Sequence, residues 1–115
     1  MSRENFLKSL FDVSGVGLEI GPSHAPLLPK KEGYNIEILD HLSREDLIKK
    51  YKNALSVDLS NIESVDYVMK DKSLHETVNK SDHYDFIVAS HVIEHIYNMI
   101  GFLNDCEKLL KKDGK

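Results

Sequence analysis

The sequence lacks several features that would place it outside the class of soluble globular proteins. It has no tryptophan, three prolines, six glycines and a single cysteine, Cys106. One cysteine cannot form an internal disulfide, and because it falls in a helical pattern we expect a buried or half-buried structural thiol. No apolar run approaches the length of a membrane span, and the opening residues MSRENFLKSLFDVSG have no apolar signal-peptide core. We therefore expect a cytoplasmic protein.

Clustered positive charge is also absent. The 19 acidic residues exceed the 15 basic ones, for a formal net charge of -4, and the basic residues are scattered in pairs. Nucleic-acid binding depends on clustered lysine and arginine side chains that neutralise phosphates. We therefore expect neither a nucleic-acid partner nor a membrane partner.

What the sequence does contain is a series of apolar, β-branched runs that alternate with helical segments. A chain of 115 residues, 41% of them hydrophobic, has room for one modest core, so a single domain over residues 1–115 is expected. Alternation of this kind is typical of parallel βαβ units and predicts an α/β fold with a mainly parallel sheet. The predicted strands are 16–20, 35–39, 65–69 and 84–89.

Two of the intervening helices carry specific expectations. Ser43 and Asp46 form a capping pair ahead of LIKKY, with acids first and lysines last, as the helix dipole favours. Residues 92–112 predict a long amphipathic helix that packs on the sheet, with Gly101 as the site of a bend. Its predicted sheet-facing residues are Ile96, Ile100, Leu103 and Leu110.

Polar residues or glycines stand at the end of each predicted strand. Ligands in open α/β sheets bind beyond the carboxyl ends of the strands, so these residues are the candidates for a site. Gly21 permits a sharp turn and a close approach of backbone to ligand. Asp40 follows about 20 residues later, a spacing typical of an acid that accepts hydrogen bonds from ribose hydroxyls. Each candidate alone is equally typical of a turn or a helix cap. The others are Glu19, Asp71, Ser90 and His91.

The stretch SHVIEH, from Ser90 to His95, permits a second interpretation. H-x-x-E-H is the pattern of inverted zinc peptidases, in which two histidines bind one metal. Such a site needs a third protein ligand from farther along the chain, and only 20 residues follow His95. His91 also falls at a strand-to-helix turn, where it need not share a helical face with His95. We therefore expect no bound metal.

Three stretches together resemble one family. They are GLEIGPSHAPLLP, IEILDH and YDFIVASHVIEHIYNMIGFLNDCEKLLKKDGK, and they are similar to class I S-adenosylmethionine-dependent methyltransferases, most of all bacterial ones related to surface-carbohydrate and glycosyltransferase-associated enzymes. The resemblance implies a Rossmann-like, doubly wound fold that here stops after the fourth strand and its helix. We therefore expect a partial domain, with little or no activity alone, that associates with itself through an open sheet edge, aggregates or is only marginally stable. Ser23 and Ala25 depart from the family, which has further glycines there.

The resemblance also implies S-adenosylmethionine as cofactor and a methyl acceptor, for which it suggests carbohydrate or another small molecule. Asp40 would hold the ribose hydroxyls, and Asp71 would face the adenine amino group. His91 would lie near the sulfonium and is the candidate catalytic proton acceptor. The full set of implied cofactor-binding residues is Glu19, Gly21, Pro22, Ser23, Asp40, His41, Asp71, Ser90 and His91.

Two other classes of function stay open. A dinucleotide-binding oxidoreductase or epimerase of the NAD type would share the sheet, the first glycine turn and the acid after the second strand. The missing G-x-G-x-x-G spacing argues against it. The second is a non-catalytic Rossmann-like scaffold or interaction module, which the sequence does not exclude.

Overall fold

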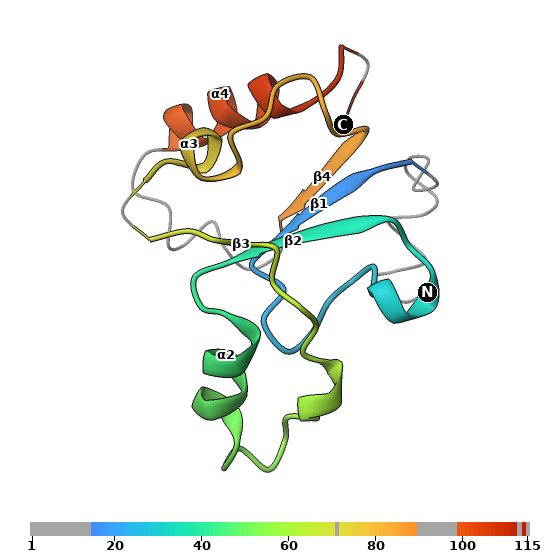
Figure 1. The fold of residues 1–115 in the computed structure, drawn as a ribbon, viewed down its shortest axis with the longest axis vertical. Coiled ribbons are helices and arrows are strands. Elements are labelled where there is room, and N and C mark those ends of the chain that lie inside the picture. The colour runs from blue at the N-terminus through green and yellow to red at the C-terminus, as the bar shows by residue number, and fades with distance from the viewer. Residues whose placement is uncertain (1–14, 71, 90–98, 113, 115) are drawn as a thin grey trace.

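The computed structural model describes residues 15–70, 72–89, 99–112 and 114. These residues form an α/β fold around one parallel sheet of four strands in the order β3-β2-β1-β4, which confirms the predicted fold class (Figure 1). The strands are β1 (Gly17–Ile20), β2 (Ile36–Asp40), β3 (Tyr67–Val68) and β4 (Phe86–Ala89). Each lies within a residue or two of its predicted bounds. The apolar residues of β1, β2 and β4 are mostly buried, whereas β3 is partly exposed, with Val68 39% exposed.

Helices connect the strands, and α3 and α4 lie together on one side of the sheet (Figure 1). Ser43 caps α2 (Arg44–Tyr51), because its side chain accepts a hydrogen bond from the Asp46 amide, as predicted. Ser73 and Glu76 form a reciprocal capping box at the start of α3. The helices are η1 (Lys30–Glu32), α2 (Arg44–Tyr51), η2 (Leu59–Asn61), α3 (Leu74–Val78) and α4 (Met99–Leu109), with η marking 3-10 turns.

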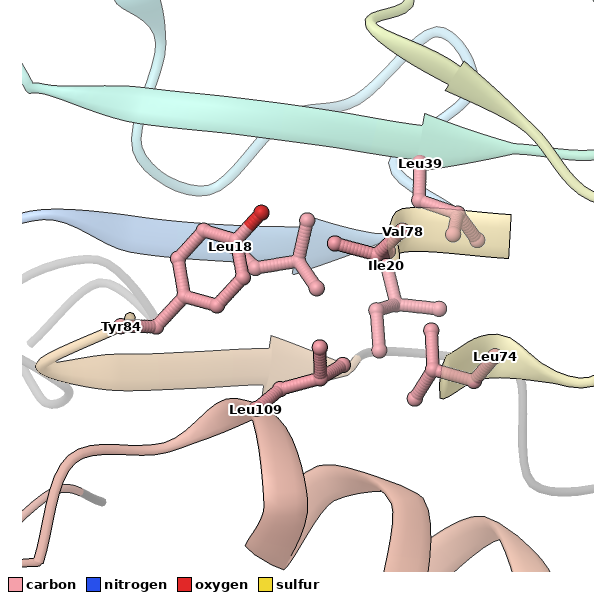
Figure 2. Packing of buried hydrophobic residues seen from close by; sticks show 7 residues of the cluster. All are labelled: Leu18, Ile20, Leu39, Leu74, Val78, Tyr84 and Leu109. Atoms are coloured by element: carbon pink, nitrogen blue, oxygen red, sulfur yellow. The ribbon is translucent and has the colours of Figure 1, made fainter. Parts of the chain in front are cut away.

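The sheet has an apolar cluster on each face, because successive strand residues point to opposite sides. Leu18 and Ile20 of β1 point toward the layer of α3 and α4, where Leu74 and Leu109 meet them (Figure 2). The other face carries a second cluster, which segment 27–34 helps to cover. Its buried members are Leu28, Ile36, Ile38, Phe86 and Val88.

The prediction for the apolar face of α4 was wrong for two of its four residues, Ile100 and Leu103. Ile100 is 75% exposed and Leu103 is 58% exposed, whereas Phe102, Cys106 and Leu109 belong to the cluster under the helix. The sequence carries two apolar stripes at helical spacing, and the stripe with the aromatic residue faces the sheet. Leu110 packs against the same cluster, as predicted, and Ile96 lies outside the described residues. The helix runs through Gly101 without a break.

The Cys106 thiol is half-buried, as expected for a structural cysteine. Burial, with a smaller contribution from the neighbouring Asp105 carboxylate, raises the pKa of this thiol to about 11. Among the described residues, no helix is both long enough and apolar enough to cross a bilayer.

A polar cluster around Glu37 adjoins the helix-facing side of the sheet. The Glu37 carboxylate accepts hydrogen bonds from the Tyr84 hydroxyl at 2.7 Å, from the Tyr67 hydroxyl at 3.1 Å and from Lys80 Nζ at 3.3 Å. Burial opposes ionisation of this carboxyl, but the hydrogen bonds from Tyr84, Lys80 and Tyr67 outweigh it and lower the Glu37 pKa. The cluster therefore links β2, β3 and the segment before β4 through one carboxylate.

Candidate functional site

The segment after β1 makes a tight turn at the carboxyl end of the sheet. The Gly21 amide extends the β1–β2 pairing by donating to the Leu39 carbonyl at 2.8 Å. Gly21 has φ 67° and Ser23 has φ 52°, both in the left-handed region, and the Ala25 amide closes the turn on the Pro22 carbonyl at 2.9 Å. Glycine adopts this region freely, but serine does so at a cost. Ser23 therefore keeps this conformation because other contacts hold it.

The first of these contacts is with Asp40, the last residue of β2. The Ser23 amide donates to Asp40 Oδ2 at 2.8 Å. On the other oxygen, Oδ1, the His41 amide donates at 2.8 Å, and His41 Nδ1 lies at the same distance. The Asp40 side chain is only 2% exposed, so this carboxylate is buried beneath the turn. Hydrogen bonds to a charged acceptor of this kind are the stronger ones in proteins.

Tyr51, at the last turn of α2, supplies the second contact. Its hydroxyl lies 3.2 Å from Ser23 Oγ. Its ring meets the His24 ring edge-on, with ring centroids 4.9 Å apart and planes inclined by 69°. Two consecutive loop residues are thus held against the helix that follows β2, and Figure 1 shows the segment after β1 passing beside α2.

Glu19 holds the far end of the same loop. Its Oε2 accepts from the Leu27 amide at 2.9 Å and its Oε1 from the Leu28 amide at 3.3 Å. Glu19 is 1% exposed and Leu28 is fully buried. The carboxylate that the resemblance places beside the methionine part of a cofactor is therefore an anchor for loop backbone in this structure, and a contact with cofactor stays a prediction.

His41 and Lys50 form the exposed margin of this region. The His41 side chain is 55% exposed, and Lys50 Nζ lies 3.5 Å from its Nε2. Lys50 Nζ also lies 5.3 Å from the centre of the Tyr51 ring. The margin beside the Asp40 carboxylate is thus basic and open to solvent.

The structure brings six of the predicted site residues together at one end of the sheet: Glu19, Gly21, Pro22, Ser23, Asp40 and His41. Asp71, Ser90 and His91 lie outside the described residues, as does His95 of the zinc pattern. Within the described part of the chain, no three metal-binding side chains converge. Tyr51 and Lys50 were not predicted, because nothing in their spacing links the end of α2 to the loop after β1.

Comparisons with known proteins bear on the fold and the family of this chain. A TehB-like SAM-dependent methyltransferase from Corynebacterium glutamicum has a similar solved structure, with a TM-score of 0.56 and 14% sequence identity. The similarity covers 96% of this chain and 57% of that one, so this chain spans little more than half the length of that protein. No curated protein sequence matches. The family described as "Methyltransferase domain" matches residues 3–115, and the chain therefore belongs to this family of methyltransferase domains.

Proposed function

We propose that this chain forms the cofactor-binding part of an S-adenosylmethionine-dependent methyltransferase. The observation that carries the proposal is the buried Asp40 carboxylate, which ends β2 directly beneath the glycine turn that ends β1. The carboxyl ends of neighbouring parallel strands are the usual place for a nucleoside in open α/β sheets. Family membership supplies the cofactor class, since it implies S-adenosylmethionine.

The residues present fit a nucleoside of this kind. An ionised carboxylate only accepts hydrogen bonds, and a ribose presents two neighbouring hydroxyl donors. Asp40 would accept them once the loop after β1 moves aside, because the carboxylate is buried here, and Gly21 at φ 67° leaves backbone without a side chain beside it. When bound, the cofactor supplies an activated methyl group, so the chain mainly has to orient its ligands and exclude water.

For the acceptor we propose a carbohydrate hydroxyl or a similar small-molecule nucleophile. The support is the resemblance of FIVASHVIEH and its following helix to carbohydrate-associated methyltransferases. In this proposal His91 accepts the proton released from the hydroxyl, because an imidazole titrates near neutral pH. His91 lies outside the described residues, so its role rests on the sequence alone.

Calorimetric titration with S-adenosylhomocysteine tests the cofactor part of the proposal. Asp40→Ala should weaken binding by roughly 1.5–3 kcal/mol, the contribution of a hydrogen bond to a charged group. Asp58→Ala is the matched control, because Asp58 is exposed and its side chain bonds locally to Ser60 at η2. Equal affinities for wild type and Asp40→Ala, with both folded by circular dichroism, would remove Asp40 from the site.

The same titration with NAD separates the alternative functions. Binding of NAD without S-adenosylhomocysteine would favour a dinucleotide enzyme, and binding of neither would favour a scaffold. Self-association through the outer edge of β4 stays a prediction, which the concentration dependence of sedimentation velocity would test.

A further inference from the structure

The Asp40 carboxylate is closed to any ligand in this structure. Its side chain is 2% exposed, whereas a ribose hydroxyl must come within about 3 Å of a carboxylate oxygen to bond to it. Its Oδ1 accepts from the neighbouring residue, His41, and its Oδ2 accepts from Ser23 across the turn. Oδ2 could accept a second hydrogen bond, but at 2% exposure no ribose hydroxyl can approach it, so the loop that carries Ser23 has to move first.

Ser23 is poised to move because its backbone is held in an unfavourable conformation. At φ 52° a residue with a side chain is stable only while its surroundings impose that angle. Besides the Asp40 bond, the contacts that impose it come from Tyr51, which bonds Ser23 Oγ and packs edge-on against the next residue, His24. The far end of the loop is held separately, by Glu19 on the Leu27 and Leu28 amides.

We propose that Tyr51 is a positioning residue of the cofactor site, which holds the loop closed on Asp40 through Ser23 and His24. The ribose of the cofactor then reaches Asp40 Oδ2 only where the loop that carries Ser23 has moved aside, so the cofactor binds the open form of the loop. Tyr51 sets how often that form occurs. This inference rests on the proposed function, because it takes Asp40 as the ribose acceptor.

Substitutions in a binding site usually weaken binding, but removing the Tyr51 hydroxyl should strengthen it. Tyr51→Phe removes the hydroxyl bond to Ser23 and keeps the ring, so the open form becomes more populated. Apparent affinity rises in proportion to the binding-competent fraction. Tyr51→Phe should therefore bind S-adenosylhomocysteine about two- to tenfold more tightly, the factor that one neutral hydrogen bond represents. The gain should appear in the association rate, whereas a merely structural role would leave affinity unchanged or lower it.

The experiment has one arm without ligand and one with it. In the first, hydrogen exchange at the Ser23 amide is compared between wild type and Tyr51→Phe, and faster exchange is expected in the variant. In the second, S-adenosylhomocysteine binding is measured by calorimetry and stopped flow. His24→Ala, which removes the ring contact, should act in the same direction. Tyr67→Phe is the matched control, because it removes a tyrosine hydroxyl bonded to Glu37 and should leave affinity unchanged.

The outcomes separate this inference from the proposed function. Unchanged exchange at Ser23 in Tyr51→Phe overturns the inference whatever the cofactor does. If wild type binds S-adenosylhomocysteine and Tyr51→Phe binds equally or more weakly, the inference fails and the proposed function stands. If neither binds it, both fail.

Discussion

Glu19→Gln should destabilise the protein although the side chain keeps its shape. The carboxylate of Glu19 lies on the sheet face opposite α3 and α4, is 1% exposed, and accepts from the Leu27 and Leu28 amides on its two separate oxygens. Glutamine offers one oxygen and turns an NH2 group toward the other amide. One charge-assisted hydrogen bond is therefore lost, and one backbone donor is left facing a donor.

The size of the effect follows from these contacts. A hydrogen bond to a charged group contributes about 1.5–3 kcal/mol. Glutamine is neutral, so the variant no longer carries the desolvation penalty of a buried charge, and this offsets part of any further loss. We expect the free energy of unfolding to fall by about 1.5–3 kcal/mol in urea denaturation. Amide exchange should increase at Leu27 or Leu28, at whichever amide faces the new NH2 group.

A matched control separates the loss of the buried Glu19 hydrogen bonds from the general effect of removing one negative charge. Glu107→Gln makes the same chemical change at an exposed position of α4, and we expect a change within about 0.5 kcal/mol. If Glu19→Gln is as mild as Glu107→Gln, Glu19 does not anchor the loop, and its place beside the cofactor becomes the better explanation of the residue.

Two further changes test the sheet. Gly17→Ala should cost about 1–3 kcal/mol of stability, because a Cβ there meets the buried ring of Phe86 on the neighbouring strand; wild-type stability in urea would contradict this packing. Glu37→Gln should be less stable than wild type at neutral pH, with a gap that narrows in acid. The folded-state pKa of Glu37 lies below its ordinary value of 4.5, so its stabilisation is present above that value and is lost as the pH falls through the lowered pKa. A pH-independent gap in urea denaturation would refute this.

The sheet was predictable from the sequence because its strands are nearly continuous apolar runs. The period of the apolar pattern also predicted that α4 is amphipathic, but not which of its two apolar stripes packs inward. Ile100 and Leu103 are as apolar as the residues that turn out to be buried. That choice depends on how the helix meets Leu18 and Tyr84 of the cluster beneath it, which is tertiary information.

The site was predictable in its residue types but not in its bonds. Asp40 and Gly21 were predicted as strand-end residues, and the structure places them there. The closing of the loop over Asp40 depends on the contact between Ser23 and Tyr51, which are 28 residues apart. It also depends on the left-handed backbone conformation of Ser23. Neither leaves a periodic signal, because each is fixed by packing between segments that are distant in sequence.

Glu19 and Asp40 hold the two ends of the loop after β1 with different strength, and this decides which end can open. Glu19 binds two amides, and one of them belongs to Leu28, whose side chain is fully buried, so releasing that end would expose part of the core. Asp40 binds one loop amide, that of Ser23, whose conformation is unfavourable without its partners. We therefore expect opening at the Ser23 end, with the anchor on Glu19 as the hinge. Ser23 thus both closes the loop, through its amide, and limits how firmly the loop stays closed, through its left-handed conformation.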